Sequence, residues 1–217
     1  MTGNELALRQ AIIDQCRWMN ASGLNQGTSG NISVRHRDDM LITPSSVPYD
    51  DLTPEMICAV PLDDPERWKG PKKPSSEWRF HRDILAARPE FQAIVHTHAV
   101  HCTALAICRR DIPAAHYMIA AFGGPVVRCS DFAIFGTQAL SDTALRALRG
   151  RNACLLANHG AIACGPTLER AIWLASELET LARQYILALQ IGAPFILDDA
   201  AIAETAAQFG YTGYGGA

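Results

Sequence analysis

Two histidines with one residue between them stand at the end of an apolar stretch. Residues 91–95 run directly into His96-Thr97-His98, and their apolar, partly β-branched character predicts a strand. Side chains on a strand alternate between its two faces, so His96 and His98 point to the same side. Two imidazoles on one face can bind one transition metal, because each offers a neutral nitrogen. Taken alone, the pair is equally compatible with surface or core histidines.

A third histidine and a carboxylate occupy comparable positions. Residues 153–157 resemble a buried strand, and His159 follows it. Glu77 comes after Ser75 and Ser76 at the predicted start of a helix that Pro89 ends, where the helix dipole favours an ionised carboxylate. Three histidines and one carboxylate supply the ligands of a catalytic metal site that can open to substrate. Nitrogen and oxygen donors fit Zn²⁺, with Mn²⁺ or Co²⁺ as alternatives.

The remaining histidines considered are expected to be non-ligands. His36 falls in a predicted hairpin, His81 on a helix face, and His101 on a helix surface or in its packing.

Segments rich in glycine and hydroxyl groups accompany the metal candidates. They are residues 23–31, Thr43-Pro44-Ser45-Ser46 and Pro74-Ser75-Ser76. Glycine lets a backbone approach a ligand closely, and a helix N-terminus offers free N–H groups to a phosphate. Ordinary loops and plain helix capping are the alternative interpretations. Beside a metal, such segments suggest a small phosphorylated substrate whose carbonyl the metal polarises.

Apolar periodicity predicts the elements that position these groups. We expect helices near residues 8–19, 77–88, 99–109, 139–148 and 168–189, and strands near 32–34, 40–43, 56–60, 126–129 and 153–157, in addition to the strand before His96. The loop 63–74 is rich in proline and charge. We expect one domain over residues 1–217, with a tail at about 193–217 whose composition is flexible and which is aromatic enough to fold over the site.

Composition excludes several classes of function. The net charge is -3 and the isoelectric point about 6.1, without a basic block, so neither nucleic acid nor a membrane surface is an expected partner. No run reaches the apolar length of a membrane span, and charges interrupt any signal-peptide core in residues 1–20. A cytoplasmic location follows. The seven cysteines form no Cys-x-x-Cys pair and are expected to be reduced core residues.

Several motifs in the same order resemble the class II aldolase and adducin family, and the similarity runs from about residue 5 to residue 192. The segments that carry it are Gly23-Leu24-Asn25-Gln26-Gly27-Thr28-Ser29-Gly30-Asn31-Ile32-Ser33, Leu41-Ile42-Thr43-Pro44, Pro74-Ser75-Ser76-Glu77-Trp78-Arg79-Phe80-His81, His96-Thr97-His98-Ala99-Val100-His101-Cys102-Thr103 and His116-Tyr117-Met118-Ile119-Ala120-Ala121. The resemblance implies an α/β fold of three layers, α/β/α, with a largely antiparallel central sheet. It also implies a homotetramer with active sites between subunits.

The resemblance further implies a role for individual residues. Zn²⁺ would be held by His96, His98 and His159, with Glu77 as the fourth ligand in the resting state. The phosphate would be bound by Asn31, Ser45, Ser46, Ser75 and Ser76. Tyr117 would reach the site of a neighbouring subunit, and Tyr211 or Tyr214 would close over the aldehyde.

The implied reaction is the reversible cleavage of a ketose 1-phosphate to dihydroxyacetone phosphate and an aldehyde. Glu77 would protonate C3, and Tyr117 or a water would handle the proton of the C4 oxygen. L-fuculose 1-phosphate is the first candidate substrate, and 5-deoxyribulose and 5-methylthioribulose 1-phosphates are alternatives. Other branches of the family are sugar-phosphate epimerases, dehydratases and decarboxylases that reuse the metal site, and non-catalytic interaction domains as in adducin.

Two positions depart from the family pattern. Ser45-Ser46 stands where the aldolases usually have Thr-Gly, which adds a side chain where the backbone should approach the phosphate. Asn158 stands before His159 where a second histidine is usual. Both departures bear on the geometry of the substrate site. Phe132 to Phe135 and the tail are expected to shape the aldehyde pocket.

Overall fold

A six-stranded antiparallel sheet forms the centre of the protein. The computed structural model describes residues 2–64 and 67–212, with the backbone alone at 211 and 212. The strand order is β3-β2-β1-β4-β8-β7, and every neighbouring pair is antiparallel. The strands are β1 (Asn31–His36), β2 (Asp39–Ile42), β3 (Cys58–Pro61), β4 (Ala93–Thr97), β7 (Ala153–Leu156) and β8 (Gly160–Gly165).

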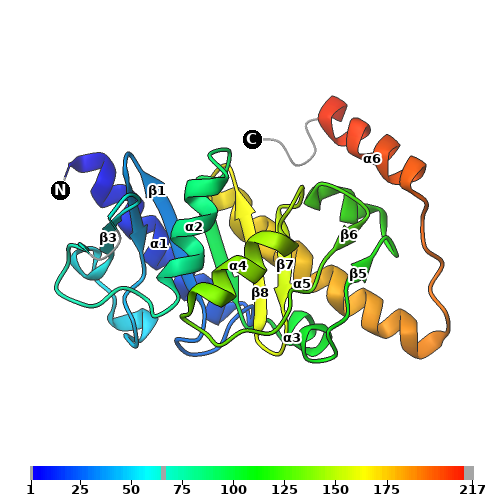
Figure 1. The fold of residues 1–217 in the computed structure, drawn as a ribbon, viewed down its shortest axis with the longest axis horizontal. Coiled ribbons are helices and arrows are strands. Elements are labelled where there is room, and N and C mark those ends of the chain that lie inside the picture. The colour runs from blue at the N-terminus through cyan, green and yellow to red at the C-terminus, as the bar shows by residue number, and fades with distance from the viewer. Residues whose placement is uncertain (1, 65–66, 213–217) are drawn as a thin grey trace.

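Helices cover both faces of this sheet, as Figure 1 shows. On one face lie α1 (Gly3–Ala21), α3 (Val100–Ile107) and α5 (Leu168–Ile191), and on the other lie α2 (Trp78–Ala87) and α4 (Gln138–Ala147). Each face has its own apolar core between helices and strands. The expected three-layer α/β/α architecture with an antiparallel sheet is therefore confirmed.

Shorter elements connect these layers. They are the 3₁₀ helices η1 (Tyr49–Asp51), η2 (Pro54–Met56) and η3 (Tyr117–Phe122), and the two-stranded ribbon of β5 (Ile112–Pro113) and β6 (Val126–Val127). The C-terminal helix α6 (Asp199–Thr212) packs against η3.

Strand β4 is buried on both faces, and its alternation determines the direction in which the His96 side chain points. Its Ala93 and Val95 belong to the core beneath α1, α3 and α5, whereas Ile94 belongs to the core beneath α2 and α4. His96 continues the alternation of Ile94 and so faces the α2 side of the sheet. The strand period places this side chain on the side of Glu77.

Some element boundaries differ from those expected. The strand expected at 56–60 begins at Cys58, because Pro54–Met56 forms η2, and the strand expected at 126–129 covers Val126–Val127 alone. Glu77 is the N-cap of α2 and lies outside its first turn, and its side chain makes no capping hydrogen bond. That carboxylate is directed at the histidines.

Strand β8 was not expected at all, because Gly160–Gly165 is built from small residues with little strand propensity. Small size is required there. A Cβ built at Gly160 would lie 2.5 Å from the carbonyl oxygen of Thr97, and one at Gly165 would lie 2.6 Å from the amide nitrogen of Ala171. β8 is thus packed closely between β4 and the start of α5.

Part of the tail at about 193–217, whose composition suggested flexibility, is helical, and its closure over the site stays a prediction. Residues 199–212 form α6, which packs against η3. Tyr211 lies in this helix with only its backbone described, and Tyr214 lies outside the described residues. No helix in the described ranges is long and apolar enough to cross a membrane.

The cysteines are all free, and five of the seven are buried as expected. Cys108 at the end of α3 is instead exposed, and Cys129 is half-buried.

Candidate metal centre and active site

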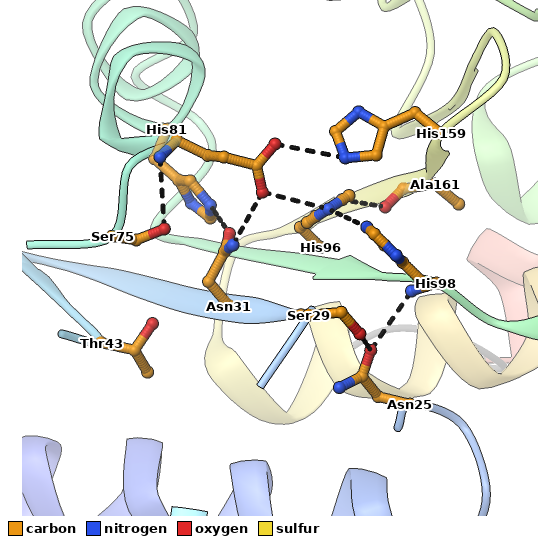
Figure 2. Close-up of polar contacts among 12 residues, drawn as sticks. Asn25, Ser29, Asn31, Thr43, Ser75, His81, His96, His98, His159 and Ala161 are labelled. Carbon is orange, nitrogen blue, oxygen red and sulfur yellow. Dashed lines mark hydrogen bonds and ion pairs between the residues drawn. The ribbon is translucent and has the colours of Figure 1, made fainter. Parts of the chain in front are cut away.

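Three histidines from two neighbouring strands meet at one point (Figure 2). The side-chain nitrogens of His96, His98 and His159 that could bind a metal all lie within 4.8 Å of one another. His96 is in β4, His98 directly follows that strand, and His159 lies in the turn from β7 to β8. Pairing of Thr97 with Ala161 aligns the end of β4 with the start of β8 and so brings the third histidine to the other two.

Hydrogen bonding fixes which nitrogen of His96 faces the centre. Nδ1 of His96 lies 2.9 Å from the carbonyl oxygen of Ala161, which can only accept, so Nδ1 carries the proton. Nε2 is then unprotonated and carries a lone pair, and it lies 3.2 Å from Nε2 of His98. Metal-binding histidines usually have this arrangement, in which one ring nitrogen donates its proton to a protein acceptor and the other points at the metal.

Burial keeps these imidazoles neutral. It lowers the pKa of His96 to about 3 and that of His159 to about 4, with the neighbouring histidines lowering both further. The pKa of His98 is also lowered by burial, against the opposing effect of the Glu77 carboxylate. The neutral form is the one that binds a metal, so the site is ready for a cation near neutral pH.

Glu77 completes the cluster from α2. Its Oε2 lies 3.3 Å from Nε2 of His96, and its Oε1 lies 3.2 Å from Nε2 of His159. Asn31 donates from Nδ2 to Oε2 at 3.0 Å. The buried Oε1 accepts no hydrogen bond from any described residue. An oxygen left without a donor beside three imidazole nitrogens fits a divalent metal with nitrogen and oxygen ligands, as in zinc sites.

A cavity of about 420 Å³ opens beside this cluster. All five residues that were expected to bind phosphate line it, namely Asn31, Ser45, Ser46, Ser75 and Ser76. Glu77, His98 and His159 line it as well. Ser46 adopts a φ of +60°, in the left-handed region that glycine occupies most easily. The unusual serine is therefore accommodated in a glycine-like backbone conformation at the cavity wall.

Part of the cavity wall is apolar. Phe132, Ile134 and Phe135 line it and expose 53%, 64% and 64% of their surface. Large apolar side chains this exposed beside polar ligands indicate a binding surface. They lie in the segment that was expected to shape an aldehyde pocket.

Tyr117 lies elsewhere in this chain. It begins η3, is 47% exposed, and contacts the rings of His116 and Phe209 at centroid distances of 4.7 and 6.3 Å. The cavity is not lined by Tyr117 in the described part of the chain. One chain therefore brings together the metal candidates and the serines but not this tyrosine.

Two further residues support the site and were not singled out from the sequence. Asn25 accepts a hydrogen bond on Oδ1 from the backbone N–H of His98 at 3.2 Å. His81, expected only on a helix face, is fully buried and bonds Asn31 and Ser33. The sequence signals of this position are its spacing from Glu77 and its place in the segment Pro74 to His81 that carries the family resemblance. His101 instead pairs through Nδ1 with Glu179 at 2.6 Å, and His36 ends β1.

The known proteins that are similar to this chain belong to one family. The family model for the class II aldolase and adducin N-terminal domain matches residues 10–186. A 5-methylthioribulose-1-phosphate/5-deoxyribulose-1-phosphate aldolase of Rhodospirillum rubrum is 54% identical over 91% of this chain and 88% of the relative. An L-fuculose phosphate aldolase of Escherichia coli is 50% identical over 96% of both chains.

A solved structure of an L-fuculose 1-phosphate aldolase superposes with a TM-score of 0.91 at 34% identity, covering 97% of this chain and 98% of the other. These matches span nearly the whole chain, the metal candidates included. The chain belongs to the class II aldolase and adducin family.

Proposed function

We propose that this protein is a Zn²⁺-dependent aldolase that reversibly cleaves a ketose 1-phosphate to dihydroxyacetone phosphate and an aldehyde. The observation that carries the proposal is the convergence of three neutral histidines and the buried Glu77 at a cavity that is lined by serines and by large apolar side chains. The names of relatives at 54% and 50% identity support a substrate of this class.

His96, His98 and His159 would hold the metal, with Glu77 as the fourth ligand before substrate binds. When bound, Zn²⁺ supplies a Lewis acid that polarises the substrate carbonyl oxygen. Mn²⁺ or Co²⁺ could replace it with the same donor set.

The substrate phosphate would be held by neutral donors. The cavity is lined by Asn31, Ser45, Ser46, Ser75 and Ser76. Hydroxyl, amide and backbone N–H groups bind phosphate oxygens without a cationic side chain.

Glu77 is in place to move the proton at C3. Its buried carboxylate faces both the histidines and the cavity, and its Oε1 has no hydrogen-bond donor among the described residues. Glu77 would protonate C3 in the cleavage direction and remove that proton in condensation. Such general acid–base catalysis is typically worth about 10²- to 10⁴-fold in rate.

Tyr117 would transfer the proton of the C4 oxygen of a substrate bound in a neighbouring subunit. Its exposed ring lies outside the cavity of its own chain, which supports a role across an interface. A homotetramer with shared sites, a single domain over 1–217 and a cytoplasmic location all stay predictions. So does closure over the aldehyde by Tyr211 or Tyr214.

The aldehyde part of the substrate would lie against Phe132, Ile134 and Phe135. An apolar wall favours an aldehyde that ends in an apolar group. The methyl and methylthio ends of L-fuculose, 5-deoxyribulose and 5-methylthioribulose 1-phosphates all meet this condition.

The test is release of dihydroxyacetone phosphate by Zn²⁺-loaded protein from these three substrates and from L-rhamnulose 1-phosphate. A coupled reductase reads the triose phosphate. We expect release from at least one substrate, and the ranking of kcat/KM identifies the preferred aldehyde. No release from all four, with zinc confirmed in the protein, would overturn the proposal and favour the epimerase, dehydratase or decarboxylase branches. Protein that retains no zinc would favour a non-catalytic, adducin-like role.

A further inference from the structure

A buried histidine that does not reach the cavity connects the sheet to the catalytic carboxylate. His81 lies on α2, is 0% exposed, and stacks on the ring of Phe80 at a centroid distance of 4.5 Å. Its Nδ1 lies 2.7 Å from Oγ of Ser33, and its Nε2 bonds Oδ1 of Asn31. Both ring nitrogens are thus used by residues of β1, and Figure 2 shows the contact of His81 with Asn31.

The hydrogen bonds that link Ser33, His81, Asn31 and Glu77 each have a fixed direction, because the chemistry of the partners decides which atom donates. A carboxylate only accepts, so Asn31 must turn its Nδ2 toward Glu77, as observed at 3.0 Å. Its Oδ1 then faces His81, and because a carbonyl oxygen also only accepts, Nε2 of His81 carries the proton.

The other ring nitrogen of His81 completes the assignment. Complete burial holds the pKa of His81 well below its ordinary value, so the ring is neutral and Nδ1 is an acceptor for the Ser33 hydroxyl. The donors therefore run from Ser33 to His81, from His81 to Asn31, and from Asn31 to Glu77.

This order of donors matters at Glu77. Oε2 of Glu77 accepts from Asn31 while lying 3.3 Å from Nε2 of His96. A reversed Asn31 amide would put Oδ1 against Oε2, two acceptors in contact, and would drive the carboxylate out of the cluster. The amide is also part of the cavity wall, so its orientation decides whether donors or an acceptor face a phosphate.

We propose that His81 is a positioning residue, which acts through Asn31 to hold the Glu77 carboxylate against the metal ligands and to keep amide donors directed at the substrate site. The catalytic part of this role rests on the proposed aldolase function. A merely structural histidine in this core could be exchanged for an apolar ring of similar size, since Phe80 already packs on one face.

Two variants separate these roles. His81→Phe keeps the ring and its stacking but removes the donor to Asn31, whereas the Gln side chain in His81→Gln offers an N–H in place of Nε2–H. Ile84→Val is the matched control, because Ile84 is equally buried on the same helix and in the same core.

Zinc affinity measured by chelator competition without substrate is the first readout. We expect His81→Phe to lose about 10- to 100-fold in zinc affinity and in kcat, as supporting partners of metal ligands usually do. His81→Gln should recover most of both, and Ile84→Val should match the wild type. Folded His81→Phe with wild-type zinc affinity and kcat would overturn the proposal, as would His81→Gln that is no better than His81→Phe.

The ring tautomer gives a readout that needs neither turnover nor a variant that folds. ¹⁵N–¹H correlation spectra of metal-free wild-type protein should show His81 as the neutral Nε2–H form with a slowly exchanging proton. An Nδ1–H form would overturn the proposal. If the wild type cleaves none of the ketose phosphates, the proposed reaction fails while the tautomer and zinc affinity still decide the positioning role.

Discussion

Oε1 of Glu77 and Nε2 of His159 lie 3.2 Å apart, although one residue is the N-cap of α2 and the other lies far along the chain in the β7–β8 turn. Oε1 is buried and accepts no hydrogen bond from the described residues. A carboxylate oxygen held in this state is available either to a metal or to a substrate proton.

Glu77→Gln should therefore lower kcat for cleavage by about 10²- to 10⁴-fold, because the amide keeps the shape but cannot exchange the proton at C3. The zinc content of the variant is measured alongside, so that loss of metal is distinguished from loss of proton transfer. Glu90→Gln, at an exposed glutamate after the same helix, is the control and should keep wild-type turnover. Glu77→Gln that retains zinc and more than a tenth of wild-type kcat would contradict the assigned role.

The histidine site was predictable because strand periodicity is a local property. The alternation of β4 places His96 and His98 together from sequence spacing alone, and each of the three histidines follows or ends an apolar run. The phosphate candidates also line the cavity: Asn31 begins β1, Ser45 and Ser46 follow β2, and Ser75 and Ser76 precede α2.

What escaped prediction depends on long-range packing. The small residues of Gly160–Gly165 give no strand signal, and only the neighbouring Thr97 and Ala171 show why larger ones cannot fit. Likewise, the contact of His81 with Asn31 requires α2 to lie over β1, which no local pattern specifies. The alanine-rich segment within 199–212 did carry a helix signal that the terminal glycines and tyrosines obscured.

Ser46 combines a left-handed backbone with a hydroxyl at the cavity wall, and two variants separate these properties. Ser46→Gly should raise the free energy of unfolding by up to about 1 kcal/mol, because glycine relieves the cost of φ +60° but loses more entropy on folding. If the hydroxyl donates to the substrate phosphate, KM should rise about tenfold. Ser46→Ala should show the same rise in KM without the gain in stability. Unchanged KM in both variants would exclude the hydroxyl from phosphate binding.

Metal-free protein should lose stability as the pH falls below about 6.5. Burial holds the pKa of His96 at about 3 and that of His159 at about 4 in the folded protein. Between these values and about 6.5, both histidines are therefore protonated in the unfolded chain and neutral in the folded one. The free energy of unfolding then falls by up to about 1.4 kcal/mol per pH unit for each histidine.

Burial also holds the pKa of His81 well below its ordinary value, so urea unfolding with a chelator present should give roughly 4 kcal/mol less stability at pH 5.5 than at pH 7.5. In His96→Gln the drop should shrink by about 1.4 kcal/mol, the share of one histidine, because its proton no longer differs between the folded and unfolded states. An equal drop in the wild type and this variant would show that His96 is not responsible.

The proposed exchange of Tyr117 between subunits can be tested by mixing two defective chains. His96→Gln removes a metal ligand and Tyr117→Phe removes the hydroxyl, and each should lower kcat by about 10²-fold or more on its own. Tyr117 is 47% exposed and lies outside the cavity of its own chain. Oligomers co-expressed from both variants should then contain sites that pair an intact His96 with an intact Tyr117 from the neighbour. Activity well above the sum of the two separate variants is expected, since complementation requires the two residues to act from different chains. Mixed oligomers, verified by two affinity tags, that are no more active than that sum would place Tyr117 outside the neighbouring site.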